Sequence, residues 1–402
     1  MTMTEHNVLA QVALGYSPMI DKHRAVTALR LTVFPVRNAH VPDVQALLAL
    51  LAEAWPAQAG RLALNVVGEG LVQQMLDAEL PPHLMLEVPA FMAGAPEQVA
   101  KIAAMYKRGN TLMVKGRPIN PLPREVLPYF SYSIIDLADE RRDGLPPPGG
   151  VARNIPHVQS GVRSLEDMTD AFKRGAIAVL GWPIESGVAA PPTRAKGSQP
   201  QMQAMVELIN RVDRGEPIDR LEAVMKNDPT MAFRLMRYIN SPAFGLSVEI
   251  TSFAHAIMLL GYQRLKRWLV LLLASGNREV DLKPVVYAAV RRGLVMEELG
   301  RGTDADEERR GELFICGVFS LLDRLMHQPM ATLLDSVPTS TAVRNALLDD
   351  GGPLALYMTL ALAVESGMVL DIQAAAENLM VTMPTVNKAL LRALISARQL
   401  DL

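Results

Sequence analysis

The chain lacks the features of an exported or membrane-inserted protein. Its 402 residues include one cysteine, Cys316, so no internal disulfide can form, which is usual in a reducing compartment. The first residues have neither the basic nor the apolar region of a signal peptide. The most apolar run, residues 354–364, is shorter than the roughly 20 residues that span a bilayer. We therefore expect a cytoplasmic protein without membrane insertion.

An excess of charge of either sign is also missing. The 40 basic and 42 acidic side chains give a net charge of −2, whereas domains that bind nucleic acid are usually strongly basic. Arg264, Lys266 and Arg267 lie beside Trp268, where a nucleic-acid patch is one interpretation. We interpret them instead as the solvated face of a helix, and we expect no nucleic-acid partner.

The histidines show no metal-binding spacing. Seven are present and none is followed by aspartate, although imidazole and carboxylate groups together make good ligands for transition metals. His255 falls within a predicted helix, where a surface or packing role is favoured over a ligand role. No metal and no cofactor is expected.

Two domains are predicted from composition. Half of the residues are hydrophobic, and at about 150 residues per domain the length allows two or three domains. Residues 188–200 are rich in proline and glycine and poor in apolar side chains, as in a linker. The predicted division is a first domain over 1–187, the linker over 188–200 and a second domain over 201–402.

The first domain alternates β-type and helical patterns. Strands are predicted at 25–34, 61–67, 84–88, 111–114, 133–137 and 179–182, with helices at 44–53, 70–77, 96–108 and 165–174. Alternation of this kind predicts a parallel sheet, either open or closed as a barrel.

The second domain is helical nearly throughout. Helices are predicted at 202–214, 218–225, 229–239, 251–260, 262–274, 283–300, 307–326, 330–336, 339–348, 353–366, 371–379 and 384–397. No β-hairpin signal interrupts them, so this half is predicted to be all-α.

One helix–turn–helix motif in the second domain is distinctive. Asp228 can cap a helix, and the Asn240-Ser241-Pro242 sequence ends it because the residue before a proline avoids the α region. This stretch resembles the HDOD domain of bacterial signalling proteins, which is similar to the HD phosphohydrolases without their metal ligands. The candidate docking residues are Arg234, Arg237, Asn240, Ser241, Pro242, Phe244 and Gly245. A local turn-fixing role for Asn240 is favoured over direct partner contact.

The first domain resembles a different family, the EAL phosphodiesterases of cyclic di-GMP, whose fold is a βα barrel. The likeness rests on short stretches around Ser17–Asp21, Leu62–Asn65, Leu84–Val88 and Gly161–Ser164. Between Asp136 and Val158, where the family has a full helix, the sequence has only a Pro- and Gly-rich run, Leu145–Gly150, so an incomplete or distorted barrel is expected. With the later stretches Phe314–Met326 and Gly351–Leu354, nearly the whole chain resembles the EAL–HDOD proteins of the YuxH-like type.

Most catalytic positions of the EAL family are changed here. Arg30 stands at the position of the signature glutamate, Lys115 and Gly116 at the paired aspartates, and Ile134 at the lysine of the next strand. The later glutamate and glutamine correspond to Ser160 and Leu180, so that only Asn65 and Glu87 stay in register. A two-metal phosphodiesterase needs several oxygen ligands, and the resemblance therefore implies a degenerate domain with no catalytic residue.

The function expected from these resemblances is signal transduction through protein–protein interaction, linked to cyclic di-GMP, motility or attachment. The partner is expected to be another signalling protein, and cyclic di-GMP is expected to bind weakly or not at all. Two alternatives stay open: a sensor that binds cyclic di-GMP without hydrolysis, and an active phosphodiesterase.

Overall fold

The computed structural model describes residues 8–36, 42–118, 121–140, 155–185, 199–218, 220–221, 253–275, 282–336 and 339–399. Contacts between residues divide the chain into two compact units. The first unit combines residues 1–186 with two C-terminal segments, 363–377 and 382–387, and the second contains the other residues. The predicted division did not join those two segments to the first domain. Its linker falls mostly outside the described residues, so the boundary itself stays a prediction.

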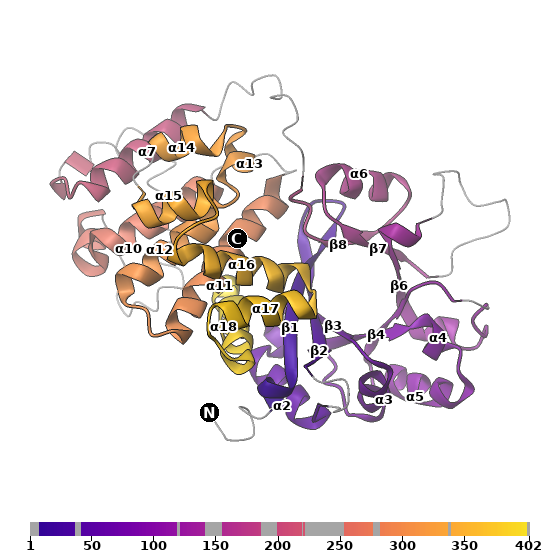
Figure 1. Ribbon diagram of the computed structural model, residues 1–402. Helices are drawn as coiled ribbons and strands as arrows, with labels where there is room; N and C mark the ends of the chain where they lie inside the picture. Colours follow the sequence, from indigo (N-terminus) through magenta and orange to yellow (C-terminus); the bar gives the residue numbers. More distant parts are fainter. Residues whose placement is uncertain are drawn as a thin grey trace. The chain divides into compact units, whose positions relative to one another are not determined.

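The first unit is built on a closed barrel of eight strands in sequence order (Figure 1). The strands are β1 (Val12–Asp21), β2 (Val26–Pro35), β3 (Arg61–Val66), β4 (Leu84–Pro89), β5 (Thr111–Lys115), β6 (Phe130–Asp136), β7 (His157–Val162) and β8 (Ala178–Gly181). The expectation of an incomplete barrel was wrong, because β6 and β7 pair directly over Ser133–Asp136. A barrel closes through the pairing of its neighbouring strands, and this pairing is continuous around all eight strands.

One strand of the barrel departs from the predicted parallel sheet. β1 runs antiparallel to both of its neighbours, β2 and β8, while every other neighbouring pair is parallel. A short turn that includes Arg24, at a φ of 62°, joins β1 to β2. Antiparallel strands need only such a turn, whereas parallel strands need a crossover connection.

Helices cover the outside of the barrel between successive parallel strands. They are α2 (Val44–Ala54), α3 (Glu69–Asp77), α4 (Ala90–Ala93), α5 (Pro96–Lys107) and α6 (Leu165–Lys173), with 3-10 turns η1 (Ala57–Ala59), η2 (Leu127–Tyr129) and η3 (Leu137–Asp139). Asp43 caps α2 by accepting from the Ala46 N–H, and Ser164 with Asp167 forms a capping box on α6. The four predicted helices of this half are thereby confirmed.

Helices make up the described part of the second unit and continue into the C-terminal segments. They are α7 (Gln199–Asp213), α10 (Phe253–Ser275), α11 (Lys283–Gly302), α12 (Glu307–Phe319), α13 (Leu322–Met326), α14 (Met330–Ser336), α15 (Thr341–Leu348), α16 (Pro353–Ser366), α17 (Val369–Asn378) and α18 (Met383–Gln399). Gly261, with a φ of 72°, breaks α10 where the sequence predicted a helix end. The single helix predicted over 307–326 is two helices, because Leu321 leaves the helical conformation.

The centre of the second unit is α11, which is buried along nearly its whole length. It crosses α12 at two glycines: a Cβ added to Gly317 would lie 2.6 Å from the Gly293 Cα. Such close approach of two helix backbones requires residues without side chains.

The interpretation of Lys266 and Arg267 as a solvated helix face was wrong. Arg267 donates two hydrogen bonds to the Glu297 carboxylate, one of them 2.6 Å long, and its guanidinium lies 4.3 Å from the Phe314 ring centroid. Lys266 pairs with Asp213, and its side chain is 13% exposed. The two cations therefore serve packing within the helical unit.

Among the described residues, no single helix is both long and apolar enough to cross a membrane. One bent pair, Thr341–Leu348 with Pro353–Ser366, meets the criteria of length and composition when taken together.

Cys316 gives a chemical probe of the second unit. The thiol is buried on α12, and burial raises its pKa to about 12, with Glu312 adding to the effect. Because the thiolate is the reactive form, alkylation by iodoacetamide at pH 8 should be about three orders of magnitude slower in the folded protein than in urea. Mass spectrometry of timed samples measures both rates. Equal rates in the two conditions would contradict the burial of this thiol.

Candidate functional site

The interior of the barrel is filled in layers, and the first layer is apolar. Side chains alternate between the two faces of a strand, so one set of alternate residues points inward from each strand. The buried cluster inside the barrel consists of Met19, Ala28, Ala63, Met85, Met113, Ile134, Val158, Ala178 and Leu180. Ile134 and Leu180, two of the positions singled out from the sequence, are thus core residues.

The second layer is polar. Two residues beyond the apolar layer, the same inward face carries Arg30 on β2, Asn65 on β3, Glu87 on β4, Lys115 on β5 and Ser160 on β7. Asn65, Glu87, Lys115 and Ser160 lie toward the carboxyl ends of their parallel strands, the end of a βα barrel that carries active sites. Arg30 lies in the middle of the longer strand β2. The structure therefore brings five of the predicted positions into one site, which we call the barrel mouth.

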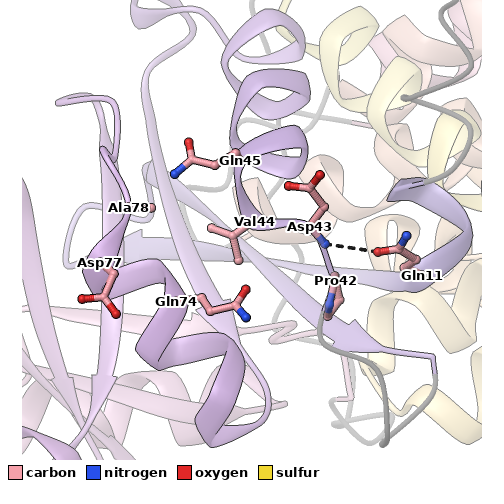
Figure 2. Close-up of a pocket in the computed structure, with 8 residues that line it drawn as sticks. All are labelled: Gln11, Pro42, Asp43, Val44, Gln45, Gln74, Asp77 and Ala78. Carbon is pink, nitrogen blue, oxygen red and sulfur yellow. Dashed lines mark hydrogen bonds between the residues drawn. The ribbon is translucent and has the colours of Figure 1, made fainter.

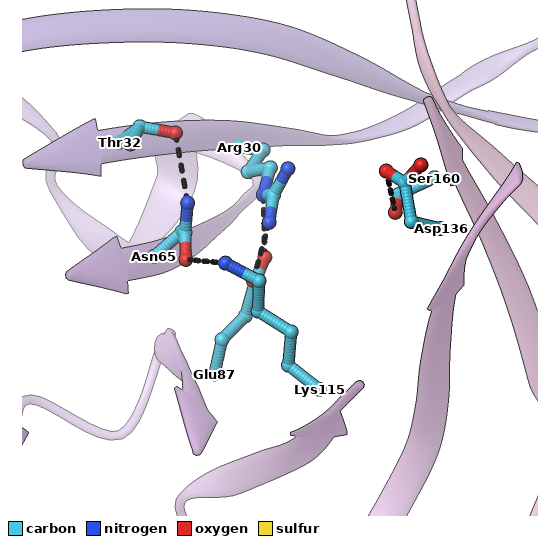
Figure 3. Close-up of polar contacts among 7 residues, drawn as sticks. All are labelled: Arg30, Thr32, Asn65, Glu87, Lys115, Asp136 and Ser160. Carbon is cyan, nitrogen blue, oxygen red and sulfur yellow. Dashed lines mark hydrogen bonds and ion pairs between the residues drawn. The ribbon is translucent and has the colours of Figure 1, made fainter. Parts of the chain in front are cut away.

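An ion pair occupies the middle of the barrel mouth (Figure 3). Arg30 donates from Nε to Glu87 Oε1 at 2.7 Å and from Nη2 to Oε2 at 2.6 Å. The Glu87 side chain is fully buried, and that of Arg30 is 14% exposed. A bidentate pair of this kind is both strong and directional, so both carboxylate oxygens of Glu87 are engaged.

A second set of contacts lies beside this pair and is centred on Asn65. Lys115 donates from Nζ to Asn65 Oδ1 at 2.9 Å, and the Asn65 amide donates to Thr32 Oγ1 at 3.2 Å. Burial lowers the pKa of Lys115, which the Glu87 charge opposes and the Arg30 charge reinforces. The ammonium is thus held in a partly desolvated position among fixed polar groups.

Asp136 and Ser160 form the third part of the barrel mouth. Ser160 donates to Asp136 Oδ2 at 3.2 Å, while Asp136 Oδ1 accepts from the Ala138 N–H. Gly161 follows with a φ of 77°, and a Cβ there would lie 2.9 Å from both Asp136 oxygens. A glycine is needed to let this carboxylate lie against the strand.

The residues of the barrel mouth do not fit a pair of divalent cations. Mg²⁺ and Mn²⁺ sites are built from carboxylate and carbonyl oxygens, and two such ions are required about 3.5–4 Å apart for two-metal hydrolysis. Here Glu87 is bound to a guanidinium, and Lys115 adds a second cation within the network. Within the described ranges, no three His, Cys, Asp or Glu side chains come together.

A separate pocket lies on the outside of the barrel, between α2 and α3 (Figure 2). Its volume is about 490 Å³, and its lining includes Asp43, Gln74 and Asp77. Both carboxylates here already serve the fold: Asp43 caps α2, and Asp77 pairs with Lys101. The Asp43 N–H donates to Gln11 Oε1. We assign no function to this pocket.

The predicted docking residues lie outside the described part of the chain. They are Arg234, Arg237, Asn240, Ser241, Pro242, Phe244 and Gly245. Their roles in a turn or at a partner surface stay predictions.

Sequence reasoning missed the roles of Thr32 and Asp136 in the barrel mouth. Both lie two residues from another inward-facing position of the same strand, Arg30 and Ile134 respectively. Extending the period-two pattern of each strand by one step would have found them.

Several known proteins are similar to parts of this chain. The HDOD domain model matches residues 200–334. The chain is 27% identical over 164 residues to the protein YuxH of Bacillus subtilis, covering 40% of each chain. It is also 27% identical over 141 residues to the cyclic di-GMP phosphodiesterase CdgJ of Vibrio cholerae, covering 35% of this chain and 32% of the relative. These matches therefore span less than half the length of either relative.

Among solved structures, the FimX EAL domain of Pseudomonas aeruginosa bound to c-di-GMP is similar at 12% identity and a TM-score of 0.29. The match covers 44% of this chain and 90% of that domain. Residues 200–334 thus carry an HDOD domain, and the first unit is an eight-stranded barrel.

Proposed function

We propose that this chain acts in cyclic di-GMP signalling as a non-catalytic protein that works through protein–protein contacts. The link to cyclic di-GMP is supported by the similarity to CdgJ, a phosphodiesterase of that nucleotide. The HDOD match supports the signalling role, with the segment around Asn240 as the proposed docking region.

The observation that carries the non-catalytic proposal is the Arg30–Glu87 ion pair. Hydrolysis of a phosphodiester by two metals needs carboxylates that are free to bind cations. Arg30 places a guanidinium on both oxygens of Glu87, at 2.7 and 2.6 Å. A divalent cation would have to displace a buried charged partner, which favours a degenerate site.

The proposal predicts, first, an absence of turnover. The full-length protein with cyclic di-GMP and Mg²⁺ or Mn²⁺ should give no linear product above a buffer blank, because Glu87 is held by Arg30. Chromatography of the nucleotides measures this, with an active phosphodiesterase as the positive control. Turnover in the wild type that is lost in Glu87→Gln would contradict the proposal, whereas activity present in both proteins is contamination.

The second prediction concerns binding without hydrolysis. The positive charges of Arg30 and Lys115 are offset by the negative charges of Glu87 and Asp136, so little net positive charge is left for a phosphate. Calorimetric titration with cyclic di-GMP should give no saturable heat at micromolar concentrations. A dissociation constant near 1 μM, or about −8.2 kcal/mol, would instead favour the sensor alternative.

A further inference from the structure

The first half of β1 has an edge that none of the eight described strands covers. β8 pairs with β1 only over Met19–Asp21, whereas β2 pairs with it from Val12 onward. Gln11 O accepts from the Val36 N–H, directly after β2. Since alternate residues of an antiparallel strand turn their backbone groups toward the partner, those of Val12, Leu14 and Tyr16 point to the open side.

A single asparagine from the far end of the chain meets this edge. Asn387 is fully buried at the start of α18, within the segment 382–387 that belongs to the barrel unit. Its Oδ1 accepts from the Leu14 N–H at 3.0 Å, and its Nδ2 donates to Val12 O at 2.7 Å and Leu9 O at 2.9 Å. The amide side chain thus makes the bonds that a neighbouring strand would make.

The second C-terminal segment of this unit, residues 363–377, continues the cover. The Trp182 indole N–H is shared between Tyr16 O at 3.2 Å and Glu365 O at 3.1 Å. At Gly15, an added Cβ would lie 3.1 Å from the Gly367 Cα and 3.2 Å from Val364 O. The backbone of β1 therefore packs directly against the backbone of the 363–377 segment.

We propose that residues 363–377 and 382–387, the two C-terminal segments of the barrel unit, form a strap that closes the open edge of β1 and is held there by Asn387. An unpaired strand edge is a template for pairing with another chain, and proteins cover such edges. Here the cover comes from a segment that follows the HDOD match at 200–334. The β1 edge is consequently a docking surface that the two C-terminal segments of the barrel unit occupy.

Hydrogen exchange of the full-length protein, followed by mass spectrometry, tests the strap. Asn387→Leu has similar volume but leaves the Leu14 N–H, Val12 O and Leu9 O without partners. Amides of residues 9–16 should exchange about tenfold faster or more, because local opening sets their protection. The matched control is Asn378→Leu, the same change at an exposed position of α17, which should leave these amides unchanged.

A milder variant covers the case in which Asn387→Leu does not fold. Gly15→Ala removes no hydrogen-bonding group but places a methyl against Gly367 and Val364. Exchange should then rise on both sides of the contact, in residues 9–16 and in residues 363–369. Wild-type protection of residues 9–16 in either folded variant would overturn the strap.

Discussion

Replacing Arg30 with methionine should lower the free energy of unfolding of the barrel unit by about 3 kcal/mol or more. The change keeps an unbranched apolar stem but removes the guanidinium, and the buried Glu87 carboxylate then loses both of its bidentate hydrogen bonds. Lys115 stays near and compensates part of the Glu87 charge. We therefore expect a loss of stability near the lower end of what breaking a buried ion pair usually costs. Tryptophan fluorescence during urea unfolding measures the effect, since Trp55 and Trp182 belong to this unit.

Two comparisons separate this effect from a general loss of charge. Lys101→Met breaks the Lys101–Asp77 pair, whose side chains are 33% and 58% exposed, and should cost less than about 1 kcal/mol. The double variant Arg30→Met/Glu87→Leu removes the unpaired charge and should recover much of the lost stability, as replaced buried pairs often do. If the Arg30→Met protein unfolded at the wild-type urea midpoint, the Arg30–Glu87 pair would contribute nothing to stability. The ion pair in the barrel mouth would then have no structural role.

Most of the strands that were predicted from the sequence have aliphatic outward side chains. β2 presents Leu29, Leu31 and Val33, all buried, and such runs predict strands covered on both faces. β7 was missed because its outward residues, His157 and Gln159, are polar although they too are buried. β1 was missed because Gly15 and Pro18 interrupt it, and both residues are depleted in strands.

The residues of the barrel mouth were predictable, but their partners were not. The family resemblance identified Arg30, Asn65, Glu87 and Lys115, and period-two alternation places them on one inward face. Sequence alone does not tell that Arg30 meets Glu87, 57 positions away, because that contact follows from strand order and register. The same holds for Asn387 and Leu14, 373 positions apart. In an otherwise regular helical pattern, nothing marks this asparagine as part of the barrel unit.

Gly317→Ala should be among the most damaging small substitutions in the helical unit. A Cβ at this position would meet the Gly293 Cα and N at 2.6 Å and the Arg292 carbonyl carbon at 2.8 Å. These atoms are backbone, so no side chain can rotate away and α11 would have to shift from α12. Overpacking of this kind costs about 1–3 kcal/mol and occasionally more. We expect about 3 kcal/mol, measured by circular dichroism at 222 nm during urea unfolding.

The same helix supplies the matched control for this prediction. A Cβ at Gly311, also in α12, would meet nothing within 4 Å. Gly311→Ala should therefore stabilise the helix by up to about 1 kcal/mol, because alanine has the higher helix propensity. If Gly317→Ala lowers the free energy of unfolding and Gly311→Ala raises it, the loss at Gly317 is due to the helix crossing. If Gly317→Ala were as stable as Gly311→Ala, α11 and α12 could not approach each other as closely as Gly293 and Gly317 do here.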